Sequence, residues 1–283
     1  MAAEKAKPKV TLPPEYTEFT FVFSKEATDH IPPSQPYNHE INLNESFMLR
    51  IGKIYPLSPN EWKATEDILD KNLKSGKIHP SNSPQASPFF FVKKKDGNLH
   101  PCQDYQYLNK HTIHNAYPLP LISDLIDKLQ DAKVFIKFDV QWRYNNIHIK
   151  NRHQWEAAFI THKGLFEPTI IFFGLTNFPA TFQCFMNDSY RDMIVEGWLV
   201  IYMDDLLIFL PDDTTHTEQI KCVLKRMKEL DLHLKLEKCN FTSSEVKYQG
   251  MIVKPGELAM DPIKLNGTHQ GEKCPILLWL CQL

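Results

Sequence analysis

Two adjacent acidic residues stand between two strongly apolar segments, and they are the residues in this sequence best suited to chemistry. Asp204 and Asp205 separate Leu199–Met203 from Leu206–Leu210, and both segments have the composition of buried strands. Neighbouring carboxylates repel each other, and burial penalises their ionisation further. A solvated two-residue turn is one alternative, because Asp is common in turns. A type I′ hairpin favours Asn-Gly or Asp-Gly, so this pair is better suited to binding a divalent cation.

A third carboxylate has the same setting. Asp139 follows the apolar segment Phe135–Phe138 directly, where a single Asp could also serve as a helix cap. Together with Asp204 and Asp205, it would give three carboxylates at strand ends, which can hold Mg²⁺ through oxygen ligands. Two such ions can activate a 3′ hydroxyl and stabilise a leaving pyrophosphate.

The elements that must position these acids alternate between helical and extended patterns without a regular repeat. A capping box at Ser58 and Glu61 predicts the start of one helix, and Asp96-Gly97 predicts a hairpin turn. The mixture predicts an α+β domain with an antiparallel hairpin at its centre. The expected helices lie at 58–76, 122–130, 179–197 and 215–230, and the expected strands at 89–92, 134–138, 199–203 and 206–210.

Composition bounds the class of protein. The 283 residues carry 32 Lys and Arg against 34 Asp and Glu, with 42% hydrophobic and 12% aromatic residues, which excludes a disordered or collagen-like chain. With a net charge of −2, any nucleic-acid surface must be local. No apolar run approaches the ~20 residues of a membrane helix, and residues 1–10 lack the apolar core of a secretion signal. Six cysteines without a close pair predict reduced thiols, so we expect a cytoplasmic or nuclear protein with no membrane partner.

The first part of the chain differs from the rest. Residues 1–57 are rich in Pro and contain stretches that we expect to be extended, such as Phe19–Phe23. We interpret this part as an arm or linker that lies along a domain with little core of its own. A disordered linker is the alternative, chiefly for residues 1–12.

The acidic residues belong to an ordered series of short motifs. In their order and content these motifs resemble the reverse transcriptase of gypsy-type LTR retrotransposons, from about Leu12 to Lys264. The segments that carry the resemblance are Phe91–Gly97, Asp104-Tyr105, Leu108-Asn109, Tyr117–Pro120, Phe138-Asp139, Tyr144–Ile147, Phe172–Asn177, Pro179–Gln183, Tyr202–Asp205, Lys238-Cys239 and Gly250.

The resemblance implies a right-hand polymerase fold with fingers, a palm built on an antiparallel central sheet, and a thumb that is incomplete or absent. It implies an N-terminal arm at 1–57, mainly fingers at 58–133, mainly palm at 134–264 and an atypical tail at 265–283.

The resemblance also implies the roles of the acids. Asp139, Asp204 and Asp205 would be catalytic and would bind two Mg²⁺ ions, for which Mn²⁺ is a possible substitute. The Val140 carbonyl would be an added ligand.

Further residues acquire roles only through the resemblance. Lys94 would reach the incoming triphosphate, and Tyr144 would lie beneath the sugar and exclude a 2′-hydroxyl. Without the family, Tyr144 would be assigned to the core and Lys93–Lys95 to a solvated charge run. Phe173 and Gly174 would also contact the nucleotide, and the primer-gripping region would contain Gln249, Gly250 and Met251.

Several positions depart from the family pattern. His100 and Gln106 stand where the family usually has Arg, which binds phosphate in a bidentate manner that His cannot reproduce. Gln249 replaces an apolar residue. Arg143 and Phe178 replace small residues, and the sequence from Gly267 on is unrelated to the family, so we expect a truncated copy.

The sequence therefore predicts an RNA-directed DNA polymerase domain that uses dNTPs and Mg²⁺ on a primed RNA or DNA template. The alternative is an impaired or inactive retrotransposon relic that keeps the fold and weak nucleic-acid binding. A metal nuclease is a weaker third hypothesis, because Tyr144 and Pro179–Gln183 would have no role in it.

Overall fold

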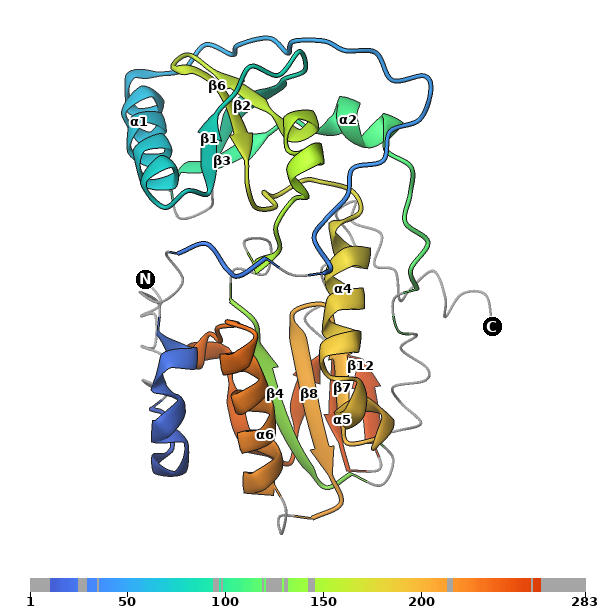
Figure 1. Cartoon of the computed structure of the whole chain (residues 1–283). Coiled ribbons are helices and arrows are strands. Elements are labelled where there is room, and N and C mark those ends of the chain that lie inside the picture. The colour runs from blue at the N-terminus through green and yellow to red at the C-terminus, as the bar shows by residue number, and fades with distance from the viewer. Residues whose placement is uncertain are drawn as a thin grey trace.

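The structure is a computed structural model. It describes residues 11–24, 30–34, 36–93, 97, 99–118, 120, 129, 132–141, 146–212, 216–255 and 257–260. The described elements form two groups, which Figure 1 shows one above the other.

The upper group is built on a five-stranded sheet with the order β1-β6-β5-β2-β3. Strands β2 and β5 are parallel and the other neighbours are antiparallel, so the sheet is mixed. Helices α1 (Pro59–Lys74) and α2 (Gln106–His111) accompany it, as do the 3-10 helices η4 (Asn151–His153) and η5 (Trp155–Ala157). The strands are β1 (Ile78–Pro80), β2 (Ser87–Lys93), β3 (Leu99–Gln103), β5 (Phe159–Thr161) and β6 (Gly164–Pro168).

The lower group is built on an antiparallel sheet with the order β7-β8-β4-β9. Helices α4 (Phe178–Ser189), α5 (Arg191–Val195) and α6 (His216–Glu229) cover one face of this sheet. A second sheet, β10-β11-β12, packs against the other face. The strands are β4 (Val134–Asp139), β7 (Leu199–Tyr202), β8 (Asp205–Leu210), β9 (Asn240–Ser243), β10 (Val246–Tyr248), β11 (Met251–Lys254) and β12 (Glu257–Met260).

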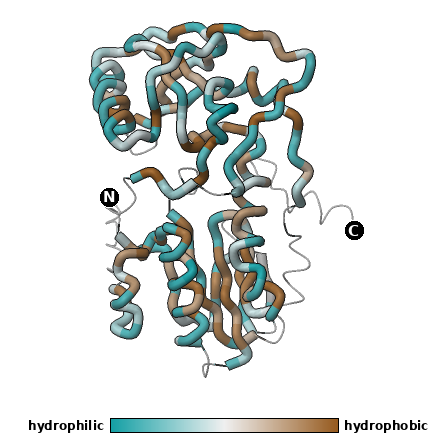
Figure 2. The backbone as a smooth tube through the Cα atoms, viewed as in Figure 1, coloured by the Kyte–Doolittle hydropathy of each residue, from teal (hydrophilic) through white to brown (hydrophobic). Residues whose placement is uncertain are grey.

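Alternation along β4 and β8 explains why both faces of this sheet are buried. Ile136 and Phe138 belong to the core beneath the helices, whereas Phe135 belongs to the core that includes β10 and β11. Successive strand residues point to opposite faces, so each strand contributes to both cores. Figure 2 shows these strands as hydrophobic tubes, with more polar helix surfaces around them. The predicted α+β fold with an antiparallel central sheet is confirmed.

The first predicted helix is also confirmed. Glu61 N lies 3.4 Å from Ser58 Oγ and Ser58 N lies 2.8 Å from Glu61 Oε2, which completes the capping box of α1. The single helix expected at 179–197 is wrong, because the structure has two helices, α4 and α5. They are separated at Tyr190, which has the non-helical angles φ −119° and ψ 22°. The Tyr190 ring at this break is fully buried and packs in the core.

The N-terminal arm differs from the expectation. Residues Pro14–Phe23 form a 3-10 helix, η1, rather than an extended stretch. Tyr16, Phe19 and Val22 are buried against the lower core, so the arm contributes to that core. Phe19 has the non-helical angles φ −102° and ψ 16°, so η1 consists of two short 3-10 segments that meet at a kink.

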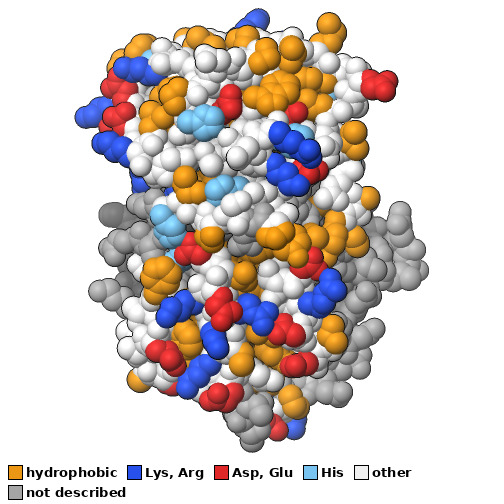
Figure 3. Space-filling view, in the orientation of Figure 1, with side chains coloured by type: hydrophobic (Ala, Val, Ile, Leu, Met, Phe, Trp, Pro, Cys, Tyr) orange, Lys and Arg blue, Asp and Glu red, His pale blue; other side chains and the backbone are white. Residues whose placement is uncertain are grey.

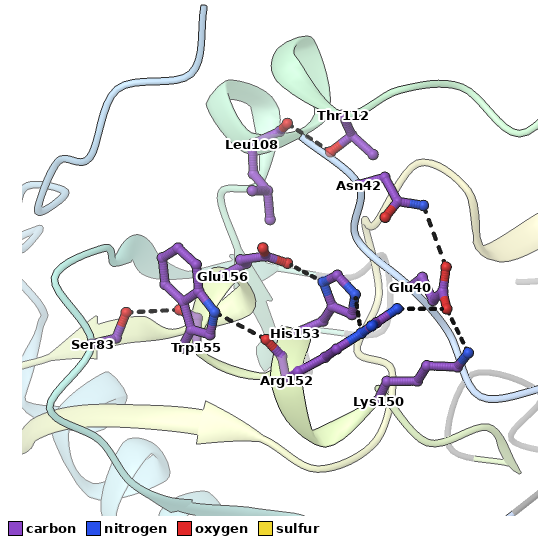
Figure 4. Close-up of polar contacts among 10 residues, drawn as sticks. All are labelled: Glu40, Asn42, Ser83, Leu108, Thr112, Lys150, Arg152, His153, Trp155 and Glu156. Atoms are coloured by element: carbon purple, nitrogen blue, oxygen red, sulfur yellow. Dashed lines mark hydrogen bonds and ion pairs between the residues drawn. The ribbon is translucent and has the colours of Figure 1, made fainter. Parts of the chain in front are cut away.

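Further along, the arm is held by ion pairs. Glu40 Oε1 contacts Lys150 Nζ at 2.5 Å and Arg152 Nη2 at 3.2 Å. Figure 4 shows these contacts beside the buried pair His153 and Glu156, whose Nδ1 and Oε2 atoms are 2.8 Å apart. Backbone bonds at His39 extend the attachment, since its N donates to His148 O at 2.7 Å.

Two predicted segments lie largely or wholly outside the described residues. The helix expected at 122–130 lies outside the described residues except for Leu129, and the tail at 265–283 lies outside them entirely. The division into arm, fingers, palm and tail stays a prediction. Within it, β5 and β6 belong to the upper sheet although they fall in the segment 134–264.

Candidate active site

A tight turn between β7 and β8 carries the acidic pair. The strands expected at 199–203 and 206–210 are each wrong by one residue at this turn, because β7 ends at Tyr202 and β8 begins at Asp205. Tyr202 pairs with Asp205, so Met203 and Asp204 form the turn and Asp205 begins β8. Met203 has φ +55°, which is uncommon for a residue other than glycine. Strained backbone of this kind persists only where the surroundings hold it in place.

Gln183 of α4 is the residue that holds this turn. Its Oε1 accepts a hydrogen bond from Met203 N at 2.7 Å, and its Nε2 donates to Ile201 O at 3.0 Å. Gln183 is fully buried, so these bonds are made out of contact with water. The same Nε2 also donates to Asn187 Oδ1 at 2.9 Å. The helix therefore fixes the position of the acidic turn through one side chain.

Asp139 lies directly opposite Asp205. The two residues are partners in the antiparallel register of β4 and β8. Val140 N, just after β4, donates to Asp204 O at 2.8 Å, which ties the end of β4 to the acidic turn. The structure thus brings Asp139, Asp204 and Asp205 to one edge of the sheet.

Lys137 shares a face of this sheet with the acids. It lies two residues before Asp139 on β4, and side chains two apart on a strand point the same way. Its Nζ lies 3.0 Å from Asp205 Oδ1, in a diagonal contact across the two strands. It also donates to Lys247 O at 3.2 Å, in β10.

Asp205 is engaged at both oxygens. Besides the Lys137 contact at Oδ1, its Oδ2 accepts a hydrogen bond from Gln249 Nε2 at 3.0 Å. Burial raises the pKa of the Asp205 carboxyl above its ordinary value, Lys137 opposes that rise, and the charges of Asp204 and Asp139 add to it. Only 16% of the Asp205 side chain is exposed, which explains why burial is the largest cause.

The two carboxylate oxygens of Asp139 differ in their contacts. Its Oδ2 accepts from Lys238 Nζ at 2.9 Å, and this hydrogen bond raises the pKa of Lys238. Its Oδ1 is buried without a hydrogen-bond partner among the described residues and lies 4.0 Å from Lys235 Nζ. A buried carboxylate oxygen without a donor is an unusual arrangement and is compatible with a cation ligand.

The fit of this edge to a metal ion follows from these contacts. Within the described ranges, no three His, Cys, Asp or Glu side chains converge in a geometry that would hold a metal ion. Two observations still favour a cation here: Asp139 and Asp205 face each other, and Asp139 Oδ1 has no donor among the described residues. Ammonium groups of Lys137 and Lys238 now supply the positive charge beside them.

The acidic edge adjoins an open cavity of about 540 Å³. Asp139 lines it with the charged residues Lys137, Lys238, Glu245 and Lys247 and with neutral Asn240. The face drawn in Figure 3 likewise has acidic and basic side chains interspersed over its lower half. Any basic surface for a polyanion must therefore be local, in agreement with the balanced composition.

The predicted nucleotide residues Phe173 and Gly174 lie in the loop between β6 and α4. Phe173 is 54% exposed, and its ring meets the ring of His100 edge-on at 6.2 Å between centroids. Gly174 has φ +106°, and a Cβ there would lie 3.6 Å from Tyr105. Asn109 fixes the loop by donating to Gly174 O at 2.6 Å. Lys94, Arg143 and Tyr144 lie outside the described residues.

The predicted primer-gripping residues lie at the tight turn between β10 and β11. Gln249 and Gly250 form the turn with φ +50° and +86°, and Met251 begins β11. Among the departures from the family, Phe178 is a fully buried core residue that packs against Phe182, whereas Gln106 is exposed at the start of α2.

Sequence reasoning assigned no role to Gln183 or Lys137. The spacing of Lys137 and Asp139 on one strand face was an available signal for the second. The bonds of Gln183 to the acidic turn join residues that only the fold brings together, so spacing could not reveal them.

Comparison with known proteins identifies the family that this sequence matches. The sequence model described as reverse transcriptase (RNA-dependent DNA polymerase) matches residues 92–253. The Transposon Tf2-3 polyprotein of Schizosaccharomyces pombe is 36% identical over 241 residues, which cover 84% of this chain and 18% of that protein. The Tf2-7 polyprotein of the same organism is 35% identical with the same coverage. The chain thus spans about a fifth of the length of these relatives.

Comparison with solved structures identifies proteins that have a similar fold. The foamy viral protease-reverse transcriptase in complex with an RNA/DNA hybrid superposes with a TM-score of 0.74 and 17% identity, covering 91% of this chain and 34% of that one. A second form of the foamy viral protein, in complex with double-stranded DNA, has a TM-score of 0.73 and 17% identity, with 96% and 51% covered.

Proposed function

This chain belongs to the reverse transcriptase family, and we propose that it is a domain that transfers nucleotides from dNTPs to a primer 3′ end on an RNA or DNA template. The main observation that supports this proposal is that Asp139 lies opposite Asp205 in the register of β4 and β8, with Asp204 in the adjoining turn. This arrangement, within the family match, favours polymerase chemistry over the weaker hypothesis of a metal nuclease.

The acids have a defined task in this proposal. Asp139, Asp204 and Asp205 would hold divalent cations, Mg²⁺ or Mn²⁺, with the Val140 carbonyl as an added ligand. When bound, two such ions would polarise the primer hydroxyl and neutralise charge on the leaving pyrophosphate. Gln183 contributes by fixing the acidic turn, so that little rearrangement of the backbone is needed during the reaction.

Other residues would bind and orient the nucleotide. Exposed Phe173 offers an apolar surface to the substrate, and Gly174 lets the backbone approach it closely. Lys94 is proposed to contact the triphosphate and Tyr144 to exclude a 2′-hydroxyl. Gln249, Gly250 and Met251 are proposed to grip the primer end.

The nucleic-acid partner is proposed by analogy. The foamy viral proteins are in complex with an RNA/DNA hybrid and with double-stranded DNA, and this chain shares their fold. We extend this to a primed template bound between the two groups of elements.

Within the described part of the chain, every helix is too short or too polar to cross a membrane.

An impaired copy that binds nucleic acid without polymerising is the second candidate. It is favoured by His100 in a position where the family usually has Arg, and by the lysine and glutamine contacts that engage Asp139 and Asp205.

Primer extension on an RNA template with Mg²⁺ tests the choice between the two. The proposal predicts addition of the complementary dNTP only, abolished in Asp204→Asn and retained in Asp192→Asn, a carboxylate on α5. Retained template binding without any extension, in Mg²⁺ and in Mn²⁺, would favour the impaired copy instead.

A further inference from the structure

Helix α2 holds the loop that carries the predicted nucleotide residues Phe173 and Gly174. The side chain of Asn109, on this helix, forms two hydrogen bonds with the backbone of the loop. Its Nδ2 donates to Gly174 O at 2.6 Å, and its Oδ1 accepts from Thr176 N at 3.0 Å. One side-chain amide therefore bridges two backbone groups that lie two residues apart, immediately after Phe173.

The helix that carries Asn109 is itself anchored in the interior. Leu108 is fully buried, and the buried Tyr105 donates its hydroxyl hydrogen to Ala157 O at 3.0 Å. The Tyr105 ring also lies against the loop, because a Cβ on Gly174 would be 3.6 Å from it. The position of the loop is therefore set from α2 and from the residue that precedes this helix.

The connection between α2 and the loop runs in both directions. Asn177, which directly precedes α4, donates from Nδ2 to Ile113 O at 2.7 Å and accepts at Oδ1 from Asn115 N at 3.0 Å. Two asparagines thus tie the loop to α2 and to the segment that follows it. Leu175, within the loop, is buried in the core. Loss of the contact from α2 would therefore loosen the loop locally without detaching it.

We propose that Asn109 is a positioning residue for the incoming dNTP, because it fixes the backbone that presents Phe173 and Gly174 to the substrate. This inference rests on the proposed function and assigns part of the affinity for the nucleotide to a residue that acts through the loop. A loop that is ordered before binding lowers the free-energy cost of binding, since that order need not be gained when the ligand arrives. The acidic turn is held separately, by Gln183, so the contact should affect nucleotide affinity more than the chemical step.

Two variants of the full chain remove the contact. Asn109→Leu keeps the approximate size of the side chain, and Asn109→Ala has a higher helix propensity, so that change does not weaken α2. Thr161→Val is the matched control in the turn between β5 and β6. Thr161 Oγ1 likewise bridges two backbone groups, because it donates to Gly164 O at 3.2 Å and accepts from Lys163 N at 3.1 Å.

Equilibrium titration with the complementary dNTP measures the affinity. The chain is bound to a primed template whose primer ends in a dideoxynucleotide, so that no chemistry follows binding. Loss of the contact predicts a Kd for dNTP that is roughly three- to tenfold higher in both Asn109 variants. Thr161→Val should keep the wild-type Kd. Single-turnover extension of an ordinary primer at saturating dNTP should give a rate close to that of the wild type in all three variants.

Hydrogen exchange of the Thr176 amide provides a readout that does not depend on the substrate. This amide should exchange faster in both Asn109 variants, because its hydrogen-bond acceptor is lost. Its exchange should be unchanged in Thr161→Val.

A Kd for dNTP that stays at the wild-type value in both Asn109 variants, or that rises equally in Thr161→Val, would overturn the inference. A maximal rate that falls as much as the affinity would also overturn it. Failure of the proposed function gives a different result. The wild type then binds dNTP on the blocked primer but does not extend an ordinary one, and the comparison of Kd values still decides the role of Asn109. If the wild type binds no dNTP, both fail.

Discussion

Gln183 accepts a hydrogen bond from Met203 N, in the acidic turn, at 2.7 Å and donates one to Ile201 O, in the strand that leads into this turn, at 3.0 Å. This contact links helix α4 to the strained residue that precedes Asp204. The geometry of the acidic edge therefore depends on a buried amide as well as on the acids themselves.

Replacing Gln183 by Leu should disturb both folding and activity. Met203 N and Ile201 O would be left buried without their partner, which costs about 1–3 kcal/mol each in unfolding free energy. Denaturant unfolding and primer extension measure the two effects. Gln154→Leu is the matched control, since Gln154 is also buried and bonds Ile149 O at 3.2 Å. It should lose stability but keep its turnover per folded molecule. Equal turnover in both variants would contradict the role given to Gln183.

Removal of Lys137 should shift the pH dependence of the reaction. Lys137 lowers the pKa of Asp205, against the burial that raises it. In Lys137→Met the pKa of Asp205 rises, so less of the carboxylate is ionised at a given pH. The acidic limb of the kcat/KM profile should then move to higher pH. Lys133→Met, which removes an exposed ammonium next to the start of the same strand, should leave the limb in place. An acidic limb of the kcat/KM profile that moves to lower pH in Lys137→Met would contradict this prediction.

Gly174 should be required for nucleotide binding. Its φ of +106° is rarely adopted by other residues, so Gly174→Ala should lose roughly 1–3 kcal/mol of stability. If this loop contacts the substrate, the variant should also raise the KM for dNTP. Gly164→Ala is strained in the same way, at φ +134°, with no atom within 4 Å of the added Cβ. It should destabilise without changing KM, and a KM effect of equal size in both would argue against the loop.

His100 should limit the affinity for dNTP. Its ring meets that of Phe173 in the predicted nucleotide region, where the family usually carries Arg. His100→Arg should lower the KM for dNTP several-fold, because a guanidinium can bind phosphate in a bidentate manner. His114→Arg adds the same charge on an exposed loop and should leave KM unchanged. An unchanged KM in His100→Arg would place residue 100 away from the triphosphate.

The sequence indicated that the acids lie at strand ends because each stands beside an apolar segment: Asp139 ends β4, Asp204 lies in the turn and Asp205 begins β8. Their catalytic role stays a prediction. A local pattern also predicted α1, because its capping box lies within four consecutive residues, Ser58–Glu61. Features that depend on tertiary packing were missed. Helix α4 ends at the buried residue Tyr190, and η1 is helical although its residues favour strands.

Contacts between side chains of different elements could not be predicted from the sequence. The Gln249 side chain meets Asp205 only because the β10–β11 turn packs beside the end of β8. The earlier end of β7 has a local cause, since Met203 adopts a positive φ that its residue type disfavours.

The rate of single-nucleotide addition to a primer on an RNA template, measured in Mg²⁺ for the wild type and Asp204→Asn, tests the central claim most directly. We predict addition by the wild type and a fall of at least about 100-fold in the variant, the size expected when a group that stabilises transition-state charge is lost. Asp192→Asn should keep the wild-type rate. Equal rates in the wild type and Asp204→Asn would contradict the account.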